Sequence, residues 1–148
     1  MFSQPVVFVD IETTGATSRT SEILEIALIR VENGVVVAEY ETLLKPRKPI
    51  PAFITQLTGI TNADVVDAPR FDEVADQVAE FFEGALFVAH NVAFDYSFIK
   101  RAFDDLSIPF HARRVCTVRL SRALYPEHRG HSLEKLIHRH NIPFTNRH

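Results

Sequence analysis

Two acidic residues stand at the end of the most apolar run near the start of the chain. Residues 5–11 are almost entirely β-branched, aromatic or otherwise apolar, which is typical of a central buried strand. Asp10 and Glu12 occupy alternate positions, so a strand places both carboxylates on one face, roughly 6–7 Å apart. Paired carboxylates at an apolar edge are costly unless something neutralises them, and hard divalent cations bind carboxylate oxygens. The alternative is that the strand simply emerges into solvent at Asp10.

A third acidic residue, Asp95, falls on the apolar face of a helix that the spacing predicts over residues 92–103. It shares that face with three apolar residues at i+3, i+4 and i+7, namely Phe98, Ile99 and Ala102. An interaction with the helix dipole is the alternative explanation, but it does not account for an acid on the apolar stripe. A third carboxylate that meets the first two across the sheet explains the position better. His90 and Asn91, just before the helix, serve equally well as a polar cap or as ligands for a strand end.

The remaining segments predict the elements that must position these carboxylates. Two strand-like runs, 23–31 and 35–44, flank the dipeptide Asn33-Gly34, which favours a tight hairpin turn, so the chain begins with three antiparallel strands. Helix-like and strand-like segments follow: helices at 52–57, from Pro69, at 92–103, near Leu124 and at 133–140, and short strands at 86–89 and 115–118. This order predicts an α/β fold, a mixed sheet covered by helices.

Length and composition indicate one ordinary globular domain. The chain has 148 residues, of which 46% are hydrophobic and 24% charged. Its single cysteine excludes an internal disulfide framework and fits a reducing cytosol. The sequence contains no apolar run of about 18 residues, so we expect no membrane span, and its first residues lack a signal-peptide pattern. We therefore expect a cytoplasmic protein.

Charge is divided unevenly along the chain. Residues 1–99 hold 6 Lys and Arg against 15 Asp and Glu, a net charge of −9, whereas residues 100–148 hold 10 against 4, a net charge of +6. A basic segment of this kind can supply contacts to phosphate groups. Solvated helix faces explain the same charges equally well.

Four segments together resemble the DEDD-type 3′→5′ exonucleases, in particular the histidine-containing DEDDh branch, the DnaQ-like family that includes proofreading subunits such as DNA polymerase III epsilon. Residues 9–15 (VDIETTG) resemble the first motif of that family, and residues 89–95 (AHNVAFD) resemble the second. Residues 57–61 (LTGIT) resemble the segment beside the terminal nucleotide, and residues 131–136 resemble the helix before the third motif. The likeness covers nearly the whole chain.

The resemblance implies an RNase H-like fold with a central five-stranded mixed sheet, its first three strands antiparallel, flanked by helices. It also implies two metal ions, Mg²⁺ or Mn²⁺, held by four carboxylates beside a histidine general base. Asp10, Glu12 and Asp95 correspond to three of the carboxylates, and His148 corresponds to the histidine. Eight residues are expected to bind substrate: Thr13, Thr14, Gly15, Leu57, Thr58, His90, Asn91 and Phe94.

The sequence departs from the family at its end. The family's third motif has an aspartate five residues after its histidine, whereas this sequence stops at His148, so the fourth carboxylate has no position in it. A catalytic histidine at a natural terminus would fray. We therefore expect residues 1–148 to be a single exonuclease domain truncated within the third motif.

The predicted function is metal-dependent hydrolysis from the 3′ end of single-stranded DNA, releasing nucleoside monophosphates in proofreading or repair. Its expected partners are a DNA polymerase or a fused domain, and no membrane. One alternative is an exoribonuclease of the same superfamily, because sequence patterns do not fix contacts to the 2′-hydroxyl. The other is a catalytically silent module that binds nucleic acid or a partner protein; the absent fourth carboxylate favours it, and the three retained acids oppose it.

Overall fold

The computed structural model describes residues 3–145, and within them the chain forms a mixed sheet and a set of helices. The elements are β1 (Val6–Thr13), β2 (Ile23–Glu32), β3 (Val35–Leu43), α1 (Ala52–Thr58), α2 (Asn62–Val65), α3 (Phe71–Phe81), β4 (Leu86–Ala89), α4 (Val92–Asp105), β5 (Arg114–Cys116), α5 (Thr117–Leu124) and α6 (Leu133–Arg139). No helix in this part of the chain is both long and apolar enough to cross a membrane.

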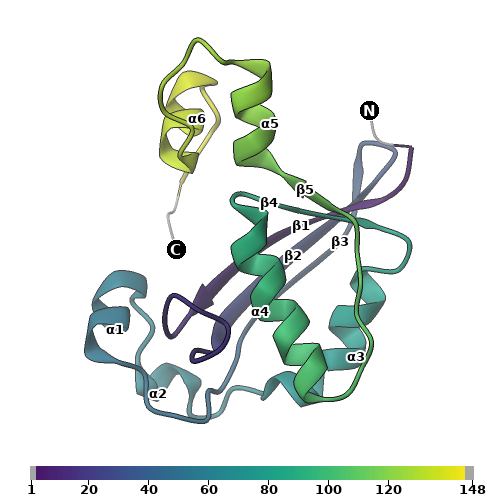
Figure 1. The fold of residues 1–148 in the computed structure, drawn as a ribbon. Helices are drawn as coiled ribbons and strands as arrows, with labels where there is room; N and C mark the ends of the chain where they lie inside the picture. Colours follow the sequence, from purple (N-terminus) through teal and green to yellow (C-terminus); the bar gives the residue numbers. More distant parts are fainter. Residues whose placement is uncertain (1–2, 146–148) are drawn as a thin grey trace.

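The sheet has five strands in the order β3-β2-β1-β4-β5 (Figure 1). β1 pairs antiparallel with β2, and β2 pairs antiparallel with β3. β1 pairs parallel with β4, and β4 pairs parallel with β5. The predicted α/β fold, a five-stranded mixed sheet whose first three strands are antiparallel, is confirmed.

The turn between β2 and β3 has the backbone that its sequence predicts. Asn33 has φ 52° and Gly34 has φ 77°, and two successive positive φ values are the requirement of a type I′ turn. Glu32 and Val35 therefore pair directly across the hairpin. This turn fixes the register between β2 and β3.

Some predicted boundaries are wrong, and local hydrogen bonds explain why. The strand expected over 115–118 ends at Cys116, because the chain turns into α5 at Thr117. Pro69 does not open α3; Arg70 is its N-cap, and the Arg70 N–H donates to the Glu73 carboxylate at 2.7 Å. The short helix α2 was not expected.

One face of the sheet carries the main core, beneath α3 and α4 (Figure 1). The core is rich in aromatic rings: Phe103 stacks on Phe110 with 4.7 Å between ring centroids, and Phe82 stacks on Phe87 at 5.1 Å. β1 turns three apolar residues toward this core, Val7, Val9 and Ile11. Because side chains alternate along a strand, the residues between them point to the opposite face.

The opposite face of β1 carries the acidic residues and is more open. Phe8 and Asp10 are exposed there, and Glu12 is half-buried. β4 pairs with β1 only from Val6 to Phe8. β1 has no partner in β4 beyond Phe8, because β4 ends there and the chain turns into α4. The start of α4 therefore lies beside the end of β1.

Phe103→Ala is expected to lower the free energy of unfolding by about 3–5 kcal/mol, because the side chain is fully buried and contacts the Phe71 and Phe110 rings. Urea unfolding measures the loss. Phe53→Ala is the matched control, since Phe53 is 63% exposed, and a change within about 0.5 kcal/mol is expected there. Equal losses in the two variants would contradict this description of the core.

Candidate active site

The first two acids stand at the outward face of β1, where the strand ends. Asp10 lies opposite Ala27 of β2, and Glu12 lies opposite Glu25. The pairing register shifts immediately after Glu12. The register between β1 and β2 thus places Glu25, a fourth acid that sequence motifs did not single out, directly across from Glu12. Like charges at facing positions of a sheet are unfavourable unless something compensates them.

The third acid, Asp95, lies in the first turn of α4 and is 5% exposed. Burial, followed by the charge of Asp10 and, more weakly, that of Glu12, raises its pKa from 3.8 to about 7. Hydrogen bonds from the backbone N–H groups of Asp95 and Ile11 act in the opposite direction. The structure therefore brings Asp95 close to both acids of β1, beside the part of that strand that β4 leaves unpaired.

These carboxylates fit a divalent cation in their chemistry. Within residues 3–145, no three His, Cys, Asp or Glu side chains form a ready-made set of metal ligands. The donors are oxygens only, which suits Mg²⁺ or Mn²⁺ better than softer metals. Burial and neighbouring negative charge both disfavour the ionised form of Asp95. A bound cation would stabilise that ionised form. His148, the predicted general base, lies outside the described residues.

The residues that follow the first acids close the loop 14–22. The Thr13 hydroxyl donates to the Gly15 carbonyl at 2.7 Å. The Glu22 N–H donates to the Thr14 hydroxyl at 2.9 Å, and the Thr14 N–H donates to the Glu22 carbonyl at 2.9 Å. A Cβ added at Gly15 would collide with the Ser21 side chain. All three residues therefore shape the loop, and their role toward substrate stays a prediction.

His90 and Asn91 lie between β4 and α4 with different environments. His90 Nδ1 lies 2.9 Å from the Thr117 hydroxyl, so the imidazole joins the end of β4 to α5. Burial lowers the pKa of His90, an effect that the His131 backbone partly offsets. Asn91 makes no side-chain hydrogen bond at its N-cap position, so the polar-cap alternative is wrong for it. Its backbone is left-handed, with φ 66°, a conformation that asparagine tolerates better than most residues.

Thr58 and Phe94 are mainly engaged within the protein. The buried Thr58 hydroxyl donates to the Ile54 carbonyl at 2.8 Å and accepts from the Ile60 N–H at 3.1 Å. These bonds complete the end of α1. Phe94 is half-buried, with its ring centroid 4.9 Å from that of Phe98. Both assignments as substrate-binding residues stay predictions.

Helix α1 presents two exposed apolar side chains near the acids. Leu57 is 69% exposed and Phe53, four residues earlier, is 63% exposed. The buried side of α1 packs through Ile54 against Leu24 of β2, beside the end of β1. Phe53, which the sequence motifs did not single out, lies on the same exposed side of α1 as Leu57 because the two are four residues apart.

A family model described as Exonuclease (RNase_T) matches residues 7–148. The chain therefore belongs to this exonuclease family. The resemblance to the DEDDh exonucleases that the motifs predicted is confirmed.

The curated relatives that the chain matches are much longer proteins. It is 41% identical over 143 residues to a PolC-type DNA polymerase III of Caldanaerobacter subterraneus subsp. tengcongensis, covering 91% of this chain and 10% of that protein. It is 38% identical over 149 residues to the 3′-5′ exonuclease DinG of Bacillus subtilis, covering 97% of this chain and 16% of that protein. The chain thus spans about a tenth to a sixth of their length.

Solved exonuclease structures share the fold. Exonuclease X in complex with 5′ overhanging duplex DNA matches with a TM-score of 0.74 at 27% identity, over 96% of this chain and 76% of that one. A product-bound exonuclease I matches with a TM-score of 0.84 at 18% identity, over 98% of this chain and 40% of that one. At 18% identity, the match to exonuclease I shows only that the fold is shared.

Proposed function

We propose that this chain is a 3′→5′ exonuclease domain that acts on DNA and releases nucleoside monophosphates. The observation that carries the proposal is the buried Asp95 carboxyl, held beside Asp10 and Glu12 with its pKa raised to about 7. Such a strongly shifted group is typical of a functional site. The relatives, a PolC-type DNA polymerase III and a 3′-5′ exonuclease, and the DNA in the exonuclease X structure support the same substrate.

Asp10, Glu12 and Asp95 would hold the divalent cations, Mg²⁺ or Mn²⁺, with Asp10 shared between two ions. When bound, such ions favour ionisation of an attacking water and stabilise negative charge on a leaving oxygen. The fourth carboxylate of the family pattern has no counterpart in residues 1–148. The proposal therefore assigns three of the four acidic ligands to this chain.

The chain's own groups handle the proton and the strand end. His148 would accept the proton of the attacking water, since imidazole titrates near neutral pH. The oxygen of the water forms a bond to phosphorus as the bond between phosphorus and the 3′ oxygen of the preceding nucleotide breaks. That 3′ oxygen takes up a proton from solvent, so the products are a nucleoside 5′-monophosphate and a strand one nucleotide shorter with a free 3′-hydroxyl. Thr13, Thr14 and Gly15, which directly follow the acids of β1, would contact the substrate backbone, and Leu57 offers an apolar surface to the terminal base.

The proposal extends to a role in proofreading or repair, with a polymerase or a fused domain as partner. Its support is the kind of protein in which the similar segments occur, a PolC-type polymerase and DinG. Association with a polymerase predicts that the exonuclease acts on strand ends that the polymerase has just extended.

Leu57→Ala is expected to weaken binding of single-stranded DNA by about 1–3 kcal/mol, which is roughly a 5- to 150-fold rise in Kd, without loss of stability. The physical reason is the loss of an exposed apolar surface on which a base can pack. Fluorescence anisotropy with a labelled oligonucleotide in Ca²⁺ measures binding without turnover. Leu124→Ala on α5, at a position of similar exposure, is the control and should bind as the unchanged protein does.

The polarity and substrate of the reaction are tested on single-stranded DNA and RNA labelled at either end, with Mg²⁺, Mn²⁺ or EDTA. Release of labelled mononucleotide from the 3′ end of DNA, abolished by EDTA, is the expected result. Faster release from RNA would replace DNA by RNA as the substrate class. No cleavage of either strand by a folded, intact protein would refute the proposal and favour a silent binding module.

A further inference from the structure

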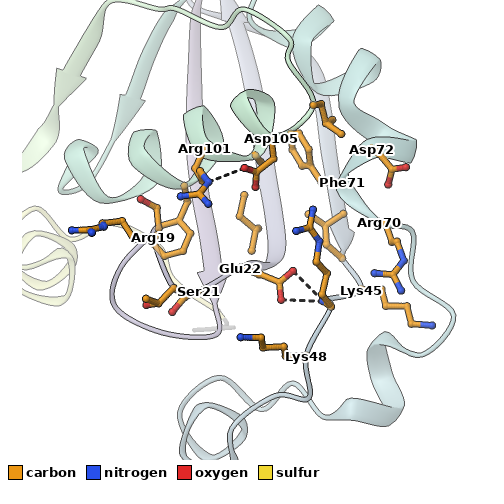
Figure 2. A pocket seen from close by; sticks show the side chains of 18 residues that line it. Arg19, Ser21, Glu22, Lys45, Lys48, Arg70, Phe71, Asp72, Arg101 and Asp105 are labelled. Atoms are coloured by element: carbon orange, nitrogen blue, oxygen red, sulfur yellow. Dashed lines mark hydrogen bonds and ion pairs between the residues drawn. The ribbon is translucent and has the colours of Figure 1, made fainter.

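A cavity of about 440 Å³ is lined by none of the three acids Asp10, Glu12 and Asp95. Its walls come from four segments: residues 18–23, residues 44–48, the start of α3, and residues 98–106 at the second half of α4 and its end (Figure 2). The apolar floor includes Phe71, Phe98 and Leu44. Cavities of this size hold small ligands or part of a larger one.

The rim of the cavity is strongly basic. Six cationic side chains line it: Arg19, Lys45, Arg47, Lys48, Arg70 and Arg101. Five of these belong to residues 1–99, a stretch that has only 6 Lys and Arg and a net charge of −9. Nearly all the positive charge of the acidic part of the chain is therefore gathered around one cavity.

The acids of the rim neutralise these cations only in part. The three acids are Glu22, Asp72 and Asp105. Both oxygens of Glu22 accept from the Arg47 backbone N–H at 3.0 Å, and Asp105 pairs with Arg101 at 2.8 Å. Across residues 3–145, no ion pair involves the side chains of the other five cationic residues. The first turn of α3 adds the partial positive charge of a helix N-terminus.

The cavity is linked to the acidic site by two elements. The loop that begins at Thr13 and Thr14 beside the acids continues into the cavity wall at residues 18–22. Helix α4 carries Asp95 in its first turn and Arg101 at the rim, which are about 9 Å apart along the helix axis. The same loop and the same helix therefore contribute residues to both the cavity and the acidic site.

We propose that this cavity binds the phosphate backbone of the strand whose 3′ end lies at Asp10, Glu12 and Asp95. The proposal rests on the exonuclease function proposed above. Six cations against three acids leave the rim a net charge of +3, which exceeds the charge of one phosphate monoester, about −2 at neutral pH, so successive phosphates of a strand match the rim better than a single free nucleotide does. Backbone contacts carry no base specificity, which suits an enzyme that removes any nucleotide.

The test is the double variant Lys45→Ala/Lys48→Ala in the intact protein, with binding of a labelled single-stranded oligonucleotide of about 16 nucleotides measured in EDTA. Two lost phosphate contacts should reduce the slope of log K against log salt by about 1.4 and weaken binding roughly tenfold near physiological salt. Lys100→Ala is the matched control, because Lys100 lies on α4, pairs with Asp104 and does not line the cavity. The oligonucleotide affinity and the salt slope of Lys100→Ala should match those of the unchanged protein.

A second arm separates the strand from a free nucleotide. Nucleoside monophosphate at millimolar concentration should fail to displace the oligonucleotide from the unchanged protein. If it displaces the oligonucleotide efficiently, and the double variant abolishes that displacement, the cavity is a nucleotide site and the strand proposal is overturned. An unchanged salt slope in the double variant would also overturn it. Release of the 3′-terminal nucleotide from a trinucleotide tests the exonuclease function separately, and the double variant should retain this activity. Loss of the cavity proposal is thereby distinguished from loss of the proposed exonuclease function.

Discussion

Asp10→Ala in the intact protein is expected to abolish 3′-end hydrolysis, with a loss of at least about 10³-fold in kcat, while the fold persists. Asp10 is exposed at the end of β1, so removing it leaves the core intact. It is also the acid whose charge acts most strongly on Asp95, and the proposed ligand common to both ions. Loss of electrostatic stabilisation at a reacting centre costs factors of this order. The assay is mononucleotide release from 3′-labelled DNA, with circular dichroism to check folding.

The control for Asp10 is Glu39→Ala, which removes an exposed acid from the same face of the sheet, on β3 opposite Ile29. It should leave kcat within about twofold, since a surface substitution away from the site has little effect. Substantial activity in Asp10→Ala, or equal losses in both variants, is incompatible with a site centred on the first motif.

The second large effect is a pH dependence of stability without metal. Asp95 has a folded-state pKa of about 7 against an ordinary value of 3.8, so the folded protein binds this proton more tightly than the unfolded chain does. The resulting stabilisation is complete below about pH 4 and is lost as the pH rises through about 7. A pKa difference of about 3 corresponds to about 4 kcal/mol, an upper figure for a group of this kind.

Urea unfolding in EDTA between about pH 4 and pH 8 measures this effect as the difference between the unchanged protein and Asp95→Asn. The asparagine variant should gain relative stability as the pH rises, because its amide carries no charge to bury. Asp76→Asn, on the exposed side of α3, should follow the unchanged protein at every pH. Mn²⁺ should restore the stability of the unchanged protein at neutral pH and have no such effect on Asp95→Asn. If the stabilities of the unchanged protein and Asp95→Asn change with pH in parallel, the raised pKa of Asp95 in the folded protein is refuted.

The sequence predicts the sheet well because its signals are local. The almost fully apolar run in residues 5–11 indicates the central strand, and Asn33-Gly34 indicates the hairpin between the next two strands. The position of Asp95 on an apolar stripe predicts that a carboxyl faces the sheet, and the structure shows that carboxyl buried beside Asp10.

What the sequence could not predict depends on contacts between distant segments. Glu25 faces Glu12 only through the register of β1 and β2. Thr58 looks like a substrate contact in the motif, yet its hydroxyl completes the end of α1. The basic cavity gathers side chains from residues 19, 45–48, 70 and 101, and no single segment of the sequence contains enough of them to reveal it.

The most direct test of the carboxylate site is calorimetric titration of the intact protein with Mn²⁺ near pH 6.5, repeated in buffers of different ionisation enthalpy. Asp95 is largely protonated there, so binding should release protons from the unchanged protein, and the observed enthalpy should vary with the buffer. Asp95→Asn should bind Mn²⁺ more weakly and without that proton release. Binding with the same affinity and the same proton release in both proteins would contradict the account, because the cation would then lie away from Asp95.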